Sequence, residues 1–427
     1  MLARPTQTLQ VLAAVLFTGL ALLMRGPTYW REMWPTPGVW QDFFQGYASA
    51  LNWRNGQPIY TPHAETFPRY TGHAFERRPM HPRVNAHPPV AVVLMIPFSY
   101  LDYETAFFIW GLLGFALFWA TCVVLARYCL GGWPAAGWIF LVGCFFLADP
   151  VLEQIHFGQM NFLLMGLLGM AAVCLQHNRQ VIGGGLVGLA ASLKLFPGFL
   201  LVYLLLRRAW RAVAGAVAAV GLSHALAFAI LGTSVWDEYV QKGLPEAQRY
   251  VLSPTCASLT GLWPKLFRGN PQDFGVHALM QSSLLKMLFN MGSIVAIVGV
   301  LVWATVRLRG TEAKGLYELY TVGMLLLSPI VWNHYMIILV PTFMVFWRLA
   351  RERIVLRAIL FGCALFLYSD FARGLVLMCI SKLTGLRPEV AQGVYPCQLL
   401  VFWASLLYCL IGLFAAGVVL VLRSNRR

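Results

Sequence analysis

Apolar segments long enough to cross a lipid bilayer recur from one end of this 427-residue chain to the other. Hydrophobic residues make up 59% of the sequence and charged residues only 11%, whereas about 25% of the residues of a soluble domain are charged. A helix needs about 20 apolar residues to cross the bilayer. The sequence therefore predicts an all-α polytopic membrane protein with about twelve transmembrane helices. The predicted crossings are residues 9–24, 104–126, 135–152, 161–176, 181–193, 197–206, 212–231, 284–306, 317–330, 335–349, 355–372 and 398–422.

The basic residues predict which side of the membrane each loop faces. In this scheme the loops on the side of the two termini hold half of the 32 basic residues but only three acidic residues, Glu312, Glu318 and Glu352. Because cytoplasmic loops carry an excess of lysine and arginine, we expect both termini to be cytoplasmic. The net charge of +15 is then a topology signal of a multi-pass plasma-membrane protein, and no nucleic-acid partner is needed to explain it.

Three long polar segments fall on the opposite, outer side of the membrane: residues 25–103, 232–283 and 373–397. We expect the functional site there, since connecting segments carry function more often than the elements they join, and we treat residues 1–427 as one domain. Within the first outer segment, "HPPVAVVLMIPFSYL" (87–101) is apolar but too short to span. It predicts an interfacial or re-entrant helix.

Two of the predicted crossings, 181–193 and 197–206, are short and are joined by "LKLFPG" (193–198). Broken helices at membrane depth are tolerated only where protein or a watery cavity covers the exposed backbone. The neighbouring "GGGLVG" (183–188) matches a dinucleotide-binding pattern, but it follows no predicted strand, and close helix packing explains it better. The sequence has no G-x-x-x-x-G-K-[ST] motif and no metal-ligand spacing, so we predict neither a cofactor nor a metal.

Asp42, in "VWQDFFQGYASAL" (39–51), is a carboxylate surrounded by aromatic residues. If residues 41–51 are helical, Asp42, Gln45 and Ser49 share one small polar face of an amphipathic helix on the membrane surface. Two roles are equally compatible with this spacing. Asp42 can be a solvent-facing helix N-cap, or a general base held beside apolar surface where water is scarce.

Lys194 stands between the two short helices, with Pro197 close behind it. Its ammonium group can extend to the outer membrane interface while its methylene chain stays in apolar surroundings. An isolated cation at a helix break within the membrane is also a candidate functional group. The natural anionic partner of such a cation is a lipid phosphate.

A group of polar residues, "EQIHFGQMNFLL" (153–164), stands at the outer start of a predicted crossing. For Glu153 and His156, ordinary capping and interfacial polarity is the favoured explanation. Gln159 and Asn161 lead directly into an apolar run, where polar groups need partners. The sequence therefore predicts a ligand-facing role for these two residues.

The outer turn "SPIVWNHYMIILVP" (328–341) carries a second group of polar residues. Trp332 and Tyr335 fit an aromatic belt at the membrane interface. Asn333 and His334 add two hydrogen-bonding side chains within the same short turn. A histidine here can donate to a phosphate or exchange protons near neutral pH.

Taken in order, these segments resemble glycosyltransferase family 87 of the GT-C fold, which includes polyprenyl-phosphomannose-dependent mannosyltransferases and an arabinofuranosyltransferase. The segments that carry the resemblance are "DFFQGYASALNWRNGQPIY" (42–60), "NAHPPVAVVLMIPFSYL" (85–101), "HFGQMNFLL" (156–164), "GLVGLAASLKLFPGFLLVYLLLRRAWR" (185–211), "ASLTGL" (257–262) and "SPIVWNHY" (328–335). The resemblance implies a GT-C membrane enzyme with interfacial helices in the first outer loop.

The resemblance also implies a reaction and a set of site residues. A hexose, with mannose favoured, would move from a polyprenyl-phosphate donor to a lipid or glycan acceptor on the outer face, with inversion at the anomeric carbon. Asp42 would be the catalytic base, and Lys194 and His334 would bind the donor phosphate. The implied substrate-binding residues are Tyr47, His87, Gln159, Asn161, Asn333 and Tyr335.

A twelve-helix transporter of a sugar or a lipid-linked solute is the alternative function. Transporters tend to carry broken helices at matching positions in both halves, but the break near Lys194 has no counterpart in the second half of the sequence. The large, asymmetric outer segments favour the transferase. Within the first of them, the insert at residues 63–83 is a candidate acceptor-binding segment.

Overall fold

The computed structural model describes residues 5–74, 83–129, 132, 134–309, 313–389 and 393–424. Within these ranges the chain forms α-, 3-10 and π-helices joined by loops, and two isolated β-bridges are the only strand-like pairings. Every predicted crossing contains a helix. The all-α architecture predicted from the apolar segments is therefore confirmed.

Five of the described helices are long and apolar enough to cross a membrane alone. They are α1 (Pro5–Glu32), α5 (Tyr103–Cys129), α11 (Trp210–Leu231), α15 (Ser283–Arg307) and α21 (Ser405–Ser424). The chain is thus a polytopic membrane protein. The shorter apolar helices include α8 (Asn161–Gln176), α9 (Gln180–Leu193), a segment that ends in α10 (Leu200–Leu206), and α16 (Leu316–Leu327). A further helix, α17 (Val340–Leu349), follows α16 along the chain.

Two further pairs of helices are sharply bent. The angle is 60° between α6 (Ala135–Leu147) and α7 (Asp149–Phe157), and 95° between α18 (Ile354–Tyr368) and α19 (Asp370–Thr384). If each bent pair is one span, the described residues contain up to seven spans by length and composition. The count of twelve crossings therefore stays a prediction.

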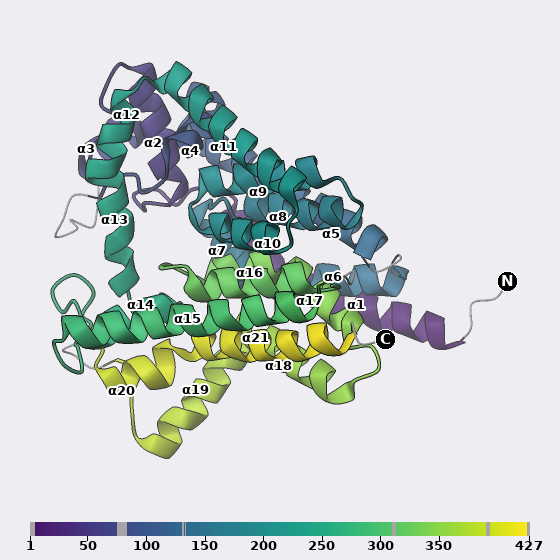
Figure 1. Cartoon of the computed structure of the whole chain (residues 1–427). Helices are drawn as coiled ribbons and strands as arrows, with labels where there is room; N and C mark the ends of the chain where they lie inside the picture. Colours follow the sequence, from purple (N-terminus) through teal and green to yellow (C-terminus); the bar gives the residue numbers. More distant parts are fainter. Residues whose placement is uncertain are drawn as a thin grey trace.

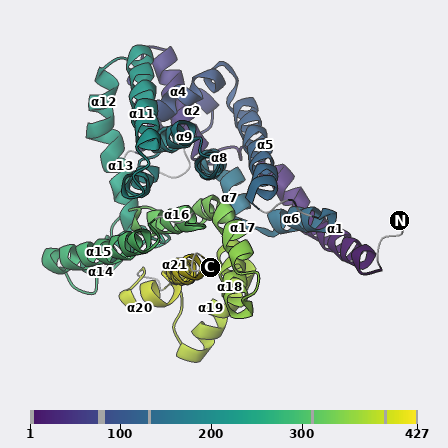
Figure 2. The ribbon, with the colours of Figure 1, turned by 45° about the vertical axis from the view of Figure 1, so that its right-hand side comes forward.

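The helices form two groups (Figure 1). One group contains α8, α9 and α11 together with the first outer segment, and the other contains α15, α16, α17 and α21. The 3-10 helix η5 (Asn333–Leu339) of the second group packs against both α7 and α8. In the turned view of Figure 2, α7 and α17 lie where the two groups meet.

The first outer segment folds onto the first group. It contains α2 (Phe43–Arg54), α3 (His63–Thr71), α4 (Pro89–Met95) and the 3-10 helix η1 (Ile96–Tyr100). The predicted interfacial or re-entrant segment corresponds to α4 and η1, and α4 packs against α2, α9 and α11. Residues 75–82 of the predicted acceptor insert lie outside the described residues.

The other two outer segments consist of short helices. Residues 232–283 form α12 (Ser234–Glu238), the π-helix η3 (Tyr239–Gly243), α13 (Leu244–Arg249), the 3-10 helix η4 (Tyr250–Leu252) and α14 (Leu259–Phe267). After α19 the chain continues into α20 (Pro396–Gln398) and the π-helix η6 (Leu399–Trp403).

Helix α2 differs from its prediction, because it is buried in protein. Phe43 and Tyr47 belong to a buried aromatic cluster, and the polar face is enclosed as well. Ser49 Oγ accepts a hydrogen bond from Asn85 Nδ2 at 2.9 Å and donates one to the Ile59 carbonyl oxygen at 3.1 Å. Protein therefore covers the polar face as well as the aromatic face of α2, and its position at the membrane surface stays a prediction. Residue spacing identified the polar face but not the protein that covers it.

Glycines bring α9 and α11 into backbone contact. A Cβ atom on Gly184 would lie 1.8 Å from the Ala212 carbonyl oxygen, and one on Gly188 would lie 2.3 Å from that of Ala216. No side chain fits at such distances, so the glycine pattern serves helix packing, as expected. This contact fixes the position of the end of α9, where Lys194 follows.

We predict that Gly184→Ala destabilises the protein, because the new methyl group meets a backbone carbonyl that no side-chain rotation can move. Overpacking of this kind costs about 1–3 kcal/mol and is measurable as a lower Tm of the purified protein in detergent. Gly299→Ala in α15 is the matched control, since nothing lies within 4 Å of its added Cβ. Equal Tm values for the two variants would contradict the α9–α11 contact.

Candidate active site

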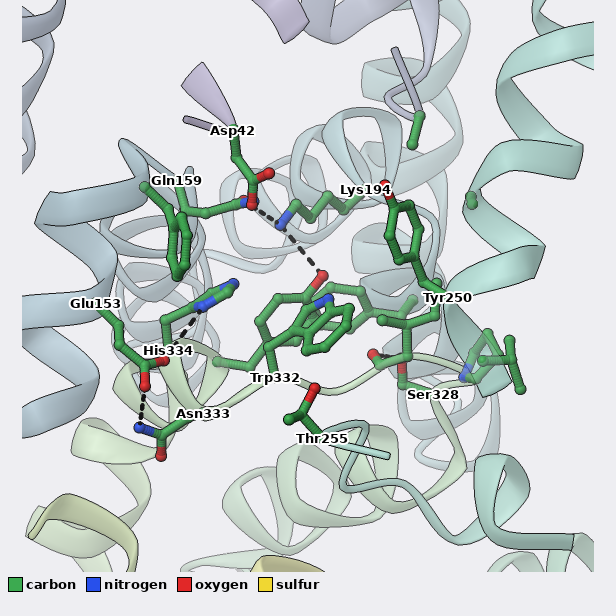
Figure 3. A pocket seen from close by; sticks show the side chains of 18 of the residues that line it. Asp42, Glu153, Gln159, Lys194, Tyr250, Thr255, Ser328, Trp332, Asn333 and His334 are labelled. Atoms are coloured by element: carbon green, nitrogen blue, oxygen red, sulfur yellow. Dashed lines mark hydrogen bonds and ion pairs between the residues drawn. The ribbon is translucent and has the colours of Figure 1, made fainter. Parts of the chain in front are cut away.

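A cavity of about 1130 Å³ is lined by residues of both helix groups. The first outer segment, α7, the break between α9 and the 3-10 helix η2 (Phe196–Phe199), η5, α13 and α19 all contribute to its wall. Pockets for organic ligands typically enclose about 300–1,000 Å³. In Figure 3, side chains from several separate segments converge in this cavity.

Asp42 occupies the N-cap position of α2, but its side chain makes no capping hydrogen bond. Its carboxylate instead accepts hydrogen bonds from Gln45 Nε2 at 3.1 Å and from Gln159 Nε2. Figure 3 shows the carboxylate facing Gln159 and the cavity. The helix-cap role therefore does not explain where this carboxylate points.

The side-chain amide of Gln159 joins Asp42 to Lys194. While its Nε2 donates to Asp42, its Oε1 accepts from Lys194 Nζ at 2.9 Å. Lys194 Nζ also donates to the Tyr335 hydroxyl at 3.3 Å and lies 4.6 Å from the centroid of that ring. One amide therefore bridges a carboxylate and an ammonium group from segments far apart in the sequence.

Helix breaks place Gln159 and Lys194 in this arrangement. Gly158 ends α7 in the left-handed conformation, with φ 61° and ψ 37°, and a Cβ there would lie 2.6 Å from Phe43 Cβ. Lys194 follows α9 in an extended conformation and is only 7% exposed. Burial lowers the pKa of Lys194 to about 8, with Asp42 partly opposing the shift. The ammonium form therefore still predominates at neutral pH.

Helix η5 brings Asn333, His334 and Tyr335 to the same cavity. Asn333 Nδ2 donates to Glu153 Oε1 at 2.9 Å. His334 Nδ1 lies 3.7 Å from Glu153 Oε2, too far for a hydrogen bond, and neither of its ring nitrogens has a hydrogen-bond partner among the described residues. Burial lowers the pKa of His334, while Glu153 partly opposes this effect. Its imidazole is therefore mainly neutral at pH 7.

His87, at the start of the apolar 87–101 segment, also lines the cavity. Its Nδ1 lies 3.1 Å from Asn85 Oδ1. Burial, with a smaller contribution from the positive charge of Lys194, lowers the pKa of His87 to about 3. This imidazole is therefore neutral at physiological pH and suits hydrogen bonding better than charge neutralisation.

Comparison with known proteins identifies the family. The sequence profile of glycosyltransferase family 87 matches residues 85–332, more than half of the chain. The chain belongs to glycosyltransferase family 87. It is therefore a membrane glycosyltransferase, which confirms the predicted family and enzyme class and favours the transferase over the transporter.

Three similar proteins come from mycobacteria. The first, from Mycobacterium tuberculosis, is a polyprenol-phosphate-mannose-dependent alpha-(1-2)-phosphatidylinositol mannoside mannosyltransferase. It is 27% identical over 79% of this chain and 76% of its own length. The protein of the same description from Mycolicibacterium smegmatis is 26% identical over 96% of this chain and 89% of its own length. An alpha-(1->3)-arabinofuranosyltransferase of Mycobacterium tuberculosis is 27% identical over 42% of this chain and 39% of its own.

The structure of this family 87 enzyme leaves two predicted site residues outside the cavity wall. The Asn161 side chain donates to Gln154 Oε1 at 2.9 Å, and the Tyr47 hydroxyl donates to the Leu101 carbonyl oxygen at 2.8 Å. Neither side chain lines the cavity. Both side chains are thus bonded to neighbouring protein groups, and a substrate contact for them stays an untested prediction.

Sequence reasoning missed several residues of the wall. Trp40, Tyr250, Thr255 and Arg373 line the cavity, but each is a single polar or aromatic residue within a long outer segment. The sequence predicted that the outer segments carry the functional site, but it gave no reason to select these four residues within them. Within the described ranges, no three histidine, cysteine or acidic side chains gather as a metal site.

We predict that Gln159→Leu destabilises the enzyme, because it removes one of the two hydrogen-bond partners of the Lys194 ammonium group and one of those of the Asp42 carboxylate. A hydrogen bond to a charged group contributes about 1.5–3 kcal/mol, and a thermal melt in detergent detects its loss as a lower Tm. Gln176→Leu, at the exposed end of α8, is the control. A Tm for Gln159→Leu equal to that of the control would show that the bridge does not form.

Proposed function

We propose that this family 87 enzyme transfers a hexose, with mannose favoured, from a polyprenyl-phosphate donor to a lipid-linked or glycan acceptor. The supporting observation is the bridge Asp42–Gln159–Lys194, which puts a carboxylate and a cation in one cavity. The mannosyltransferase relatives are described as polyprenol-phosphate-mannose-dependent and as acting on phosphatidylinositol mannosides. The charge pattern of the loops favours the outer face of the plasma membrane, with both termini in the cytoplasm.

Asp42 is the catalytic base in this proposal. The acceptor hydroxyl oxygen attacks the anomeric carbon, and the hydroxyl proton passes to the Asp42 carboxylate. The bond between the anomeric carbon and the phosphate oxygen breaks, and polyprenyl phosphate leaves with the bonding electron pair. A single direct displacement inverts the anomeric centre, so no second carboxylate is needed as a nucleophile. The hydrogen bonds from Gln45 and Gln159 fix the orientation of the base.

Lys194 binds the donor phosphate. Its ammonium group is buried beside the Tyr335 hydroxyl, where a low dielectric strengthens its attraction for an anion. The phosphate gains negative charge as it leaves, and a fixed cation stabilises that charge in the transition state. Next to Lys194, the cavity wall turns apolar through Leu195, Phe196 and Phe199. These side chains suit the first isoprene units of the donor.

His334 completes the phosphate site, and the transferred sugar lies among hydrogen-bonding groups of the same wall. His87, Gln159, Asn333 and Tyr335 supply those groups. The Glu153 carboxylate lies on one side of the His334 ring, and we place the phosphate on the other. Two flanking anions favour the imidazolium form, so donor binding would raise the pKa of His334 and add a proton to it.

We predict that Asp42→Asn lowers the transfer rate from polyprenyl-phosphate mannose to a phosphatidylinositol mannoside at least about a hundredfold, the usual contribution of a general base. Donor binding persists, because Lys194 is unchanged. The measurement is radiolabelled mannose transfer by the purified protein in nanodiscs. Asp237→Asn, on the exposed surface of α12, is the matched control. Wild-type rates in Asp42→Asn would remove Asp42 from its role as base.

We predict that the affinity for polyprenyl phosphate falls as the pH rises through the pKa of phosphate-bound His334. Binding favours the protonated imidazole, so its contribution is complete only below the pKa of the free protein, which burial places under the ordinary value of about 6.5. Lys194, Glu153 and Asp42 are the charged groups around the ring. His334→Gln should make the Kd for polyprenyl phosphate nearly independent of pH between about pH 5 and 7. The variant should keep the loss of affinity near pH 8, where Lys194 deprotonates. If the Kd of His334→Gln changed with pH between about pH 5 and 7 as that of the wild type does, His334 would be excluded from phosphate binding.

A further inference from the structure

A second polar cluster lines the cavity, and two of its members, Glu32 and His156, have no role in the mechanism above. It consists of Glu32 at the end of α1, Glu153 and His156 on α7, and Asn333 on η5, and we call it the acidic wall. Glu153 and His156 are three residues apart on one helix, so they share a face. Figure 3 shows Glu153 and Asn333 together, with His334 lying between them and Asp42.

Hydrogen bonds hold the acidic wall in place. His156 Nδ1 lies 2.6 Å from Glu32 Oε2, which ties α1 to α7. Asn333 Nδ2 donates to Glu153 Oε1 at 2.9 Å, which ties α7 to η5. Three separate segments therefore present carboxylates and an amide to the cavity in fixed positions. The contacts go beyond the capping and interfacial polarity that the sequence favoured for Glu153 and His156.

The acidic wall has unused hydrogen-bonding capacity. Asn333 is only 9% exposed, yet its Oδ1 has no hydrogen-bond partner among the described residues. The Glu153 side chain keeps 34% of its surface exposed, and a carboxylate can accept about four hydrogen bonds. Buried polar groups are almost always satisfied, so these atoms mark a place for a hydrogen-bonding ligand.

The chemistry of these atoms selects the class of ligand. Carboxylate and amide oxygens are acceptors, so the ligand must donate several hydrogen bonds. A phosphate is disfavoured beside two carboxylates, because like charges repel. Arg373 lines the same cavity, so a cationic ligand would meet a fixed positive charge as well. A neutral ring with several hydroxyl groups satisfies the acceptors without adding charge.

We propose that the acidic wall is the acceptor subsite and binds the hydroxyl groups of a neutral sugar or inositol ring. This inference rests on the proposed function, because it assigns the acceptor to one end of the cavity and the donor phosphate to the Lys194 end. Glu153 and Asp42 line the same cavity, and Figure 3 shows them on either side of His334. A ring held there therefore lies within reach of Asp42, with one hydroxyl free to be deprotonated.

The test compares acceptor and donor kinetics in the full-length protein in nanodiscs. Glu153→Gln keeps the shape of the side chain and removes its charge. We expect the KM for a phosphatidylinositol mannoside to rise about tenfold, as for the loss of one charged hydrogen bond, with a smaller change in the KM for polyprenyl-phosphate mannose. Glu32→Gln is the second variant, because Glu32 bonds His156 rather than His334. Glu104→Gln, exposed at the start of α5, is the matched control.

A binding measurement separates this inference from the proposed function. Saturation-transfer NMR records methyl α-mannoside binding to protein saturated with polyprenyl phosphate, with no transfer required. Weaker binding in Glu153→Gln and Glu32→Gln than in Glu104→Gln supports the subsite, even if the wild-type protein transfers no sugar and the proposed function fails. The inference is overturned if both variants bind methyl α-mannoside as the control does, or if donor KM rises as much as acceptor KM.

Discussion

The cavity depends on a single side-chain amide that satisfies opposite charges at the same time. Gln159 donates to Asp42 and accepts from Lys194. A direct ion pair would tie the two groups to each other, whereas the amide bridges them and keeps them apart. An unpaired buried charge costs several kcal/mol, so the network makes it possible to hold a base and a cation in one apolar protein. Substrate can then interact with both.

The network requires helices to stop at the cavity, and the sequence stops them with specific residues. Gly158 turns the chain between α7 and α8, and Pro197 follows Lys194 within η2. Interrupted helices expose backbone groups that lipid cannot satisfy. Here the interruptions face the cavity and neighbouring protein. The close α9–α11 contact, which only glycine allows at Gly184 and Gly188, fixes the position from which Lys194 extends.

The fold and the centre of the site could be predicted from the sequence to different degrees. Each of the twelve segments predicted from apolar length contains a helix, because burial in lipid or in protein demands the same composition. For that reason it could not separate full crossings from short buried helices, nor show that α2 is enclosed by protein. Asp42 and Lys194 were recognisable because a charge is rare in apolar surroundings. The partners of Glu153 and His156 were not, since Asn333 and Glu32 lie far away in sequence and only the folded chain brings them together.

The carboxylate of Asp149 explains how the acidic wall, at the other end of the cavity from Lys194, is held in position. Asp149 Oδ1 accepts from Arg25 Nη2 at 2.7 Å, and its Oδ2 accepts from the Asp370 backbone N–H at 2.5 Å. Asp149 and Asp370 begin α7 and α19, so this carboxylate joins the two helix bends to each other and to α1. Glu153 and Arg373 each follow their bend by about one turn. The bends therefore set the place of both residues, and the charge distribution of the cavity follows from where the helices break.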